Sequence, residues 1–185
     1  QRIRLIVAKL LQYARPNEYS GYLQQVRADE VFQDSLVLVG HQLGSSRVMV
    51  RTEWQAQRTL LVNRYELQQV LINLLLNALQ AMPEGGELAL ATHDCDGGDD
   101  QPGVLMTESD RGIGIADEDL ARLFTPFFTR KAEGTGLGLW VCQGLIERYG
   151  GQINAANLPQ GGAIFRVWLP CEPLLDGEPP LDTPL

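Results

Sequence analysis

Two asparagines, Asn73 and Asn77, stand four residues apart in a segment that is otherwise rich in leucine. If that segment is a helix, both side-chain amides project from the same face. An amide oxygen is a ligand that a hard cation such as Mg²⁺ accepts, so the pair is typical of a polar cleft that holds a cation. By itself, the pair also fits a solvated polar stripe on a surface helix.

A carboxylate followed by closely spaced glycines comes later in the chain, as Asp110, Gly112 and Gly114. Asp110 follows a predicted strand. The glycines let the backbone approach a flat ligand, and the carboxylate can accept a hydrogen bond from it. An ordinary turn between a strand and a helix also favours Asp and Gly for local reasons.

Three alternating glycines, Gly134, Gly136 and Gly138, with Thr135 and Leu137 between them, come directly before another predicted helix. Unpaired N–H groups at the start of a helix, together with the helix dipole, favour anions. The spacing matches neither a P-loop nor a dinucleotide-binding fingerprint. We interpret this segment as a phosphate-binding loop.

An aromatic and basic segment, residues 123–131, separates the two glycine-rich segments. It contains Phe124 and ends in Arg130 and Lys131. One interpretation is a lid that is hinged on the aromatic residues and brings the two cations over bound phosphates. The other is a hydrophobic plug with a solvated basic end.

Hydrophobic periodicity predicts the elements that must position these residues. Asn63 and Glu66 form a capping-box pattern at the start of the long helix that carries both asparagines, and Asp29 is expected to cap an earlier helix. The predicted helices cover 2–14, 29–44, 64–82, 117–124 and 136–149, and the predicted strands cover 48–54, 59–62, 87–93, 103–109, 151–157 and 162–169. This order predicts an α/β (α+β) two-layer sandwich, with a mixed, mainly antiparallel sheet and helices on one face.

The 185 residues carry a net charge of −8 that is unevenly distributed. Residues 94–102 and 172–185 each hold four acidic side chains and no basic one, so the rest of the chain is neutral. No basic stripe is present, which argues against a nucleic-acid partner. No apolar run approaches the ~18 residues that a membrane-spanning helix requires.

In this order, the segments resemble the ATP-binding catalytic domain of bacterial sensor histidine kinases, which belong to the GHKL (Bergerat-fold) superfamily. The matching segments are the asparagine box at 69–82, the first glycine box at 110–114, the phenylalanine box at 124–131 and the second glycine box at 134–139. The resemblance implies three parts: the end of the second dimerisation and phosphotransfer helix at 1–16, the catalytic domain at 17–171, and an acidic, proline-rich tail at 172–185 that is expected to be disordered.

The resemblance implies that the chain binds Mg²⁺ and ATP and donates the γ-phosphoryl group to a histidine. Neither His41 nor His93 lies in the required sequence context, so we expect the acceptor to lie upstream, in a longer parent protein, with no catalytic residue in this fragment. Asp110 is expected to accept from the adenine N6 amino group, and Asn77 is expected to bind the metal. The implied nucleotide-contacting residues are Asn73, Asn77, Asp110, Gly112, Gly114, Phe124, Arg130, Lys131, Gly134, Thr135, Gly136, Leu137 and Gly138.

The resemblance further implies a homodimeric parent, a response-regulator receiver domain as partner and a cytoplasmic location, and it leaves a membrane anchor in the parent open. Glu108, Arg111 and Gln80 depart from the family pattern. Two alternatives remain: a degenerate or regulatory nucleotide-binding domain, and a clamp-type ATPase of the same superfamily. Such ATPases carry a water-activating glutamate four residues before the metal-binding asparagine, where this chain has Asn73.

Overall fold

The computed structural model describes residues 22–130 and 134–173. The predicted helix over 2–14, Lys131 and nearly all of the predicted tail lie outside the described residues. Among the described helices, none is long and apolar enough to cross a lipid bilayer.

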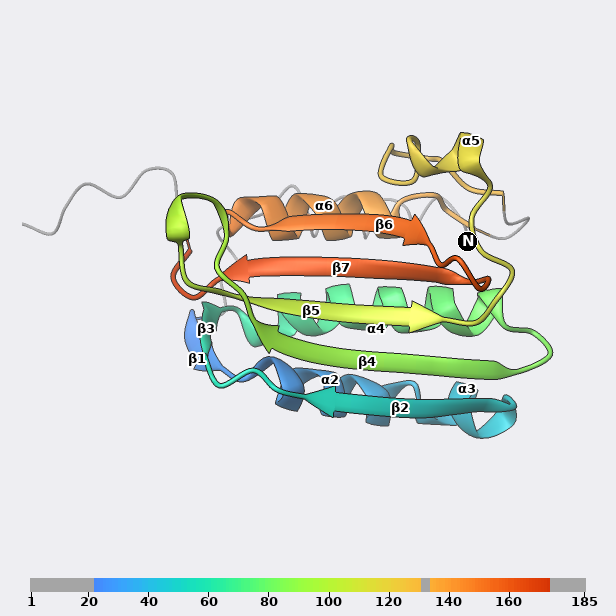
Figure 1. Cartoon of the computed structure of the whole chain (residues 1–185), viewed down its shortest axis with the longest axis horizontal. Helices are drawn as coiled ribbons and strands as arrows, with labels where there is room; N and C mark the ends of the chain where they lie inside the picture. Colours follow the sequence, from blue (N-terminus) through green and yellow to red (C-terminus); the bar gives the residue numbers. More distant parts are fainter. Residues whose placement is uncertain (1–21, 131–133, 174–185) are drawn as a thin grey trace, which may run out of the picture.

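A five-stranded sheet in the order β2-β4-β5-β7-β6 forms one layer of the molecule (Figure 1). Strand β2 pairs with β4 in parallel, and the other three pairs are antiparallel. Strands β1 and β3 form a separate antiparallel pair. The strands are β1 (Gln24–Val26), β2 (Val48–Trp54), β3 (Leu60–Val62), β4 (Gly86–Asp94), β5 (Gly103–Asp110), β6 (Gln152–Asn157) and β7 (Ala163–Pro170).

The second layer consists of α2, α4 and α6, which lie side by side on one face of the sheet (Figure 1). The helices are α2 (Ala28–Leu38), α3 (Gly40–Ser45), α4 (Arg64–Ala81), α5 (Asp117–Leu120) and α6 (Gly138–Arg148), with a short 3-10 turn, η1, at Gly98–Asp100. Helix α4 is central and buries a continuous apolar face: Leu67, Val70, Leu71, Leu74, Leu75 and Ala78. The predicted two-layer sandwich is therefore confirmed.

Helix α4 begins where the sequence predicts. The side chain of Asn63 accepts hydrogen bonds from the backbone N–H groups of Tyr65 and Glu66 at 3.0 and 3.4 Å. The carboxylate of Glu66 contacts the hydroxyl of Tyr149 and the guanidinium of Arg148, at the far end of α6. These bonds join the two helices and set how α4 is rotated about its axis.

The first described helix differs from the prediction. Asp29 is not the cap: Arg27 occupies that position and Asp29 lies in the first turn, where its carboxylate pairs with Arg27 at 3.1 Å. A carboxylate in the first turn interacts favourably with the helix dipole. Asp29 therefore does mark the start of the helix, but it lies two residues after the cap and not at the cap. The helix also breaks at Val39, which separates α2 from α3.

Two other elements also differ from the predictions. The helix expected over 117–124 ends at Leu120 and continues as turns. Strand β1 was not predicted, because three residues are too few to show an alternating pattern. The structure forms it by pairing with β3, which lies about 35 residues later in the chain.

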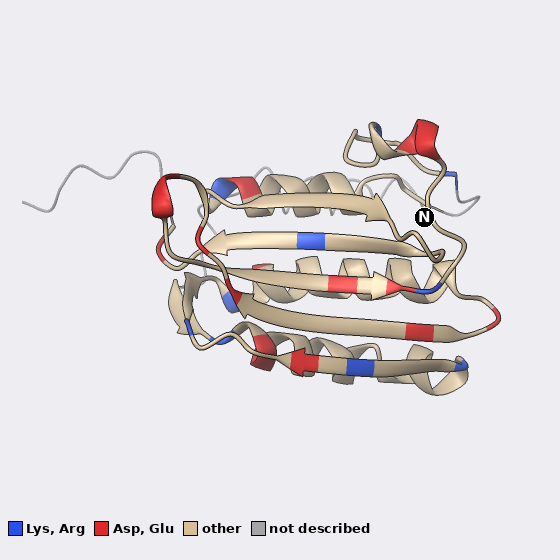
Figure 2. Cartoon of the chain, in the orientation of Figure 1, with Lys and Arg blue, Asp and Glu red and all other residues tan. Residues whose placement is uncertain are grey.

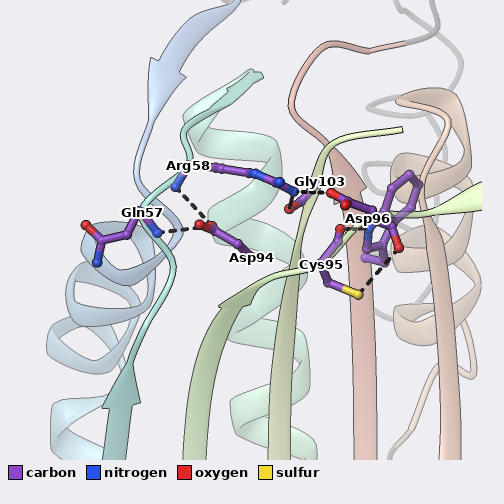
Figure 3. A network of polar contacts seen from close by, with 7 residues as sticks. Gln57, Arg58, Asp94, Cys95, Asp96 and Gly103 are labelled. Carbon is purple, nitrogen blue, oxygen red and sulfur yellow. Dashed lines mark hydrogen bonds and ion pairs between the residues drawn. The ribbon is translucent and has the colours of Figure 1, made fainter. Parts of the chain in front are cut away.

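A polar network closes the end of the sheet where β4 turns into β5 (Figure 3). The carboxylate of Asp94 accepts from the backbone N–H groups of Gln57 and Arg58, both at 3.0 Å. The guanidinium of Arg58 in turn pairs with Asp96 at 2.5 Å and donates to the carbonyl of Gly103. Asp94 and Asp96 therefore hold the loop in place. The other two acids of this loop, Asp99 and Asp100, lie in η1 at the edge of the molecule (Figure 2).

Glu108 is a buried acid in β5. It is 1% exposed, and neither carboxylate oxygen has a hydrogen-bond partner among the described residues. Its neighbours across the sheet are Leu90 and Phe165. Burial, and secondly the charge of Asp110, raises the pKa of Glu108 to about 8. The core therefore holds this group as a neutral carboxylic acid at pH 7.

We expect the Glu108→Met variant to be more stable than the wild-type chain by about 1–3 kcal/mol at pH 5, because it removes an unsatisfied buried polar group. The gain should increase with pH. The unfolded chain loses this proton near the ordinary pKa of 4.5 and the folded chain near 8, so in that interval the unfolded state binds fewer protons. Wild-type stability due to this group therefore falls as pH rises from 4.5 to 8.

Urea unfolding at pH 5, 6.5 and 8 measures the difference between the two proteins. Ser109→Ala, on the opposite face of the same strand, is the matched control and should show no pH-dependent difference. A Glu108→Met difference that is equal at pH 5 and pH 8 would show that the carboxyl group ionises normally in the folded chain.

Candidate functional site

Both predicted asparagines lie half-buried on α4. The side-chain oxygen of Asn73 would lie 3.8 Å from a Cβ atom placed on Gly138, the first residue of α6. The amide nitrogen of Asn73 donates to the Sγ atom of Cys142 at 3.5 Å. The start of α6, and with it the end of the second glycine segment, is thus fixed beside Asn73, one turn before Asn77.

The first glycine segment contacts the C-terminal end of α4. The backbone N–H of Ile113 donates to the carbonyl of Ala81 at 3.1 Å. A Cβ atom at Gly112 would lie 2.4 Å from the same carbonyl oxygen, so no larger residue fits there. This contact holds the loop that follows β5 against the last turn of the helix that carries both asparagines.

Asp110 is 2% exposed and lies at the end of β5, where this loop begins. Its carboxylate accepts from the backbone N–H of Gly112 at 2.7 Å. Burial raises the pKa of Asp110, although hydrogen bonds from the N–H groups of Gly112 and Ala163 act in the opposite direction. A Cβ atom at Gly162, which has a φ of +88°, would lie 1.9 Å from the Asp110 carbonyl oxygen, so the turn between β6 and β7 packs directly on this residue. Asp110 is therefore a well-oriented hydrogen-bond acceptor.

The phenylalanine and second glycine segments contact each other. Gly136 has a φ of +66°, and a Cβ atom there would lie 2.4 Å from the backbone of Phe127. The sequence predicts that this helix begins at residue 136, but α6 begins at Gly138. The positive φ of Gly136 explains the difference, because that conformation is not helical. Leu137 is 1% exposed and anchors this segment, and Phe124 packs against the core. Thr135 accepts from the N–H of Leu137 at 3.4 Å.

Arg130 lies next to α5. Its guanidinium contacts the carboxylate of Glu118 and pairs with Asp119 at 2.5 Å. These contacts raise the pKa of Arg130, with the hydrogen bond that it donates to Asp119 as the largest cause. If Arg130 is to contact phosphates, as the sequence predicts, it must exchange these carboxylates for them. Lys131 lies outside the described residues.

The sequence prediction missed Asn157, at the end of β6. Its side-chain oxygen accepts from the N–H of Ile115 at 2.8 Å, and its amide nitrogen donates to the carbonyl of the same residue at 2.6 Å. The amide nitrogen also reaches Asp117 at 3.4 Å. Asn157 therefore ties the loop beyond Gly114 to the end of β6. An asparagine at the end of a strand, shortly before Gly161 and Gly162, is the one signal that was available.

The arrangement combines three chemical features around α4: an acceptor at Asp110, an amide oxygen at Asn77, and backbone N–H groups at the start of α6. In the parts of the chain that the structure describes, no group of three or more His, Cys, Asp or Glu side chains is placed to hold a metal ion. An amide oxygen, as on Asn77, is a ligand type that Mg²⁺ accepts.

Comparisons with known proteins agree with this geometry. Residues 63–173 match the family described as histidine kinase-, DNA gyrase B- and HSP90-like ATPase. Sensor histidine kinase ZraS of Salmonella typhimurium is 36% identical over 170 residues, which cover 91% of this chain and 35% of that protein. Sporulation kinase A of Bacillus subtilis is 32% identical over 171 residues, which cover 91% of this chain and 27% of that protein. The chain thus spans about a third of the length of these relatives.

Solved structures show the same fold. The nucleotide-free catalytic domain of histidine kinase ThkA has a TM-score of 0.73 at 27% identity and covers 83% of this chain and all of that one. Histidine kinase ThkA in complex with the response regulator TrrA has a TM-score of 0.73 at 25% identity and covers 93% of this chain and 48% of that one. With its family match, its relatives and its fold in agreement, the chain belongs to the histidine kinase-, DNA gyrase B- and HSP90-like ATPases, as a catalytic domain of the histidine kinase type.

Proposed function

We propose that this domain binds ATP with Mg²⁺ and donates the γ-phosphoryl group to a histidine on an acceptor domain of the same parent protein. The observation that carries the proposal is the convergence of two separate segments on α4. The start of α6 lies beside Asn73, and the loop after Asp110 lies against Ala81. These two contacts are eight residues apart, about 12 Å along a helix, so the phosphate and base ends of a nucleotide have separate places.

At the base end, the carboxylate of Asp110 accepts a hydrogen bond from the exocyclic amino group of adenine. At the phosphate end, the N–H groups of Gly136 and Gly138 face anions, and the dipole of the 11-residue α6 favours negative charge there. The amide oxygen of Asn77 lies between the two ends and would hold Mg²⁺, which neutralises charge on the phosphates when bound.

Phosphoryl transfer breaks the bond between the γ-phosphorus and its bridging oxygen and forms a bond from phosphorus to an imidazole nitrogen of the acceptor, with ADP as the leaving group. The protein contributes by positioning the triphosphate and stabilising its charge. Asn73 cannot act as a general base, because an amide has no basic lone pair of the required strength. Because no base at this position activates water, Asn73 supports transfer to a histidine rather than hydrolysis of ATP.

The same proposal includes the surroundings of the domain. We infer a homodimeric parent, a cytoplasmic location for this domain and a response-regulator receiver domain as the downstream partner. The ThkA complex with TrrA supports the last inference, since it shows that a kinase with this domain type binds a response regulator.

Asp110→Asn should strongly reduce the preference for adenine. Guanine presents an oxygen where adenine has its amino group, so the wild-type carboxylate rejects it, and we expect ATP to bind on the order of 10²-fold more tightly than GTP. The variant amide can donate to that oxygen, and the ratio should fall well below that of the wild-type chain. Calorimetric titration with both nucleotides measures it. Equal wild-type affinities would contradict the role of Asp110, and Ser109→Ala, on the opposite face of β5, is the control.

Asn77→Ala should weaken the binding of Mg·ATP by about tenfold or more, because a ligand of the cation is lost. Binding of ATP in the presence of a chelator should change much less. Titrations with and without Mg²⁺ separate the two effects. Gln69→Ala is the matched control, because this residue lies about two turns earlier on α4 and is not part of its buried face. An equal loss under both conditions would make Asn77 a purely structural residue.

The chain should bind ATP without labelling itself, and it should phosphorylate a separately supplied dimerisation and phosphoacceptor domain of its parent. Transfer should be slow, since the effective concentration provided by a covalent link is lost. Incubation with γ-labelled ATP, with and without that domain, tests this. Acid-labile label on the chain alone would make His41 or His93 an acceptor, and fast phosphate release without the acceptor would favour a clamp-type ATPase. Binding without transfer would favour the regulatory alternative.

A further inference from the structure

Glu108 is the buried carboxyl group for which the fold provides no partner. Of the described side chains, only Thr92 and Glu108 have buried polar atoms without a hydrogen bond, and Glu108 has two of them. Buried polar groups in folded proteins are nearly always hydrogen-bonded, and an unsatisfied one costs stability. An acid at this position therefore weakens the core unless a ligand supplies the missing hydrogen bonds.

Its position in β5 connects it with the base end of the proposed site. The strand alternates, so Met106, Glu108 and Asp110 lie on the same buried face, towards the helices. Two residues along a strand span about 6.6 Å, which places Glu108 directly behind Asp110 as seen from the loop. The two groups sense each other, because the charge of Asp110 contributes to the raised pKa of Glu108.

The surroundings of Glu108 contain no cation to keep it ionised. Its partners in β4 and β7 are Leu90 and Phe165, and the buried residues of α4 are apolar. On α6 the buried titratable group is the thiol of Cys142, which lies against the carbonyl of Val70. Of the described charges, Asp110 is the one that acts on Glu108. A neutral carboxylic acid offers one O–H donor as well as an acceptor.

We propose that Glu108 is a specificity-determining residue for the nucleobase, and that its carboxylic acid donates a hydrogen bond to a ring nitrogen of the adenine whose amino group Asp110 accepts. This inference rests on the proposed ATP-binding function. Adenine carries acceptor nitrogens, N1 and N7, on either side of its amino group. Asp110 and protonated Glu108 form an acceptor–donor pair that complements an amino group and an adjacent ring nitrogen. Guanine reverses this pattern at its N1 edge.

The proposal makes ATP affinity depend on pH. Binding uses the protonated form of Glu108, so the affinity is constant below its pKa and falls above it, as the donor is lost and a second negative charge appears beside Asp110. The expected loss is about tenfold per pH unit above the pKa, until the bound form also ionises. No change of this kind is expected for a carboxyl group that has no contact with the ligand.

The experiment compares wild-type chain with Glu108→Gln, which keeps a donor but cannot ionise, and with Glu108→Met, which has neither property. Dissociation constants for ATP are measured by calorimetry between pH 6.5 and 9.5. Binding of 1-deaza-ATP and 7-deaza-ATP, which lack N1 and N7 respectively, is measured in the same way. At pH 7, Glu108→Met should bind ATP roughly five- to tenfold more weakly than wild type, the size expected for one hydrogen bond. One deaza analogue should weaken wild-type binding to a similar extent but leave Glu108→Met unaffected.

Glu108→Gln should retain most of the affinity at pH 7 and lose the pH dependence. Thermal unfolding of each variant separates binding from folding, because Glu108→Met is expected to gain stability while it loses affinity. Ser109→Gln is the matched control on the opposite face of β5. If ATP binding depends on Asp110 but Glu108→Met binds as tightly as wild type over the whole pH range, this inference is wrong and the proposed function stands. Absence of ATP binding in the wild-type chain would overturn both.

Discussion

Close contact between backbones at the C-terminal end of α4 is the constraint on which the site depends. At the end of α4, Gly112 passes within van der Waals distance of the Ala81 carbonyl, and the next residue donates to that carbonyl. On the other side of the same loop, Gly162 lies against the carbonyl of Asp110. A Cβ atom at either glycine would overlap a backbone oxygen, so the position of Asp110 relative to the helix is set by main-chain contacts that side-chain repacking cannot relieve.

The second glycine segment follows the same principle. Gly136 adopts a left-handed conformation against the backbone of Phe127, and this turns the chain into α6 beside Asn73. The glycines of the two motifs therefore have a structural task in addition to exposing N–H groups. They let one loop reach the middle and the other the C-terminal end of one helix. That helix is itself held by Asn63 at its start and by Glu66 against α6.

Stability and the proposed function oppose each other at Asp110 and Glu108. Asp110 compensates its burial with hydrogen bonds from Gly112 and Ala163. Glu108, one alternation further into the core, has no such compensation. A pair of buried carboxyl groups in one strand can persist only if at least one is neutral, because two charges at this separation in a medium of low polarity repel strongly. The pair thereby becomes an acceptor and a donor.

The sequence by itself predicted most of the elements and the residue types on which the proposed chemistry rests. The spacing of apolar residues, together with Asn63, located α4 correctly, and the polar residues that could hold a nucleotide were recognised from their types and order. Such signals are local, and they persist because a helix or strand buries one face wherever it packs. They failed where the local signal was short or ambiguous, as for β1 and for the cap of α2, where Arg27 displaced Asp29.

Only the tertiary structure decided which residues meet. Asn157 bonds to Ile115, 42 residues earlier in the sequence, and Arg130 pairs with Asp119 in α5. Neither contact follows from spacing along the chain. Glu108 shows the difference most clearly. Its alternating position in a strand was visible in the sequence, but the absence of a partner for either oxygen depends on what the sheet neighbours and the helix layer place around it. Pairing and burial are properties of the packed molecule, because the atoms that satisfy or desolvate a group come from distant segments.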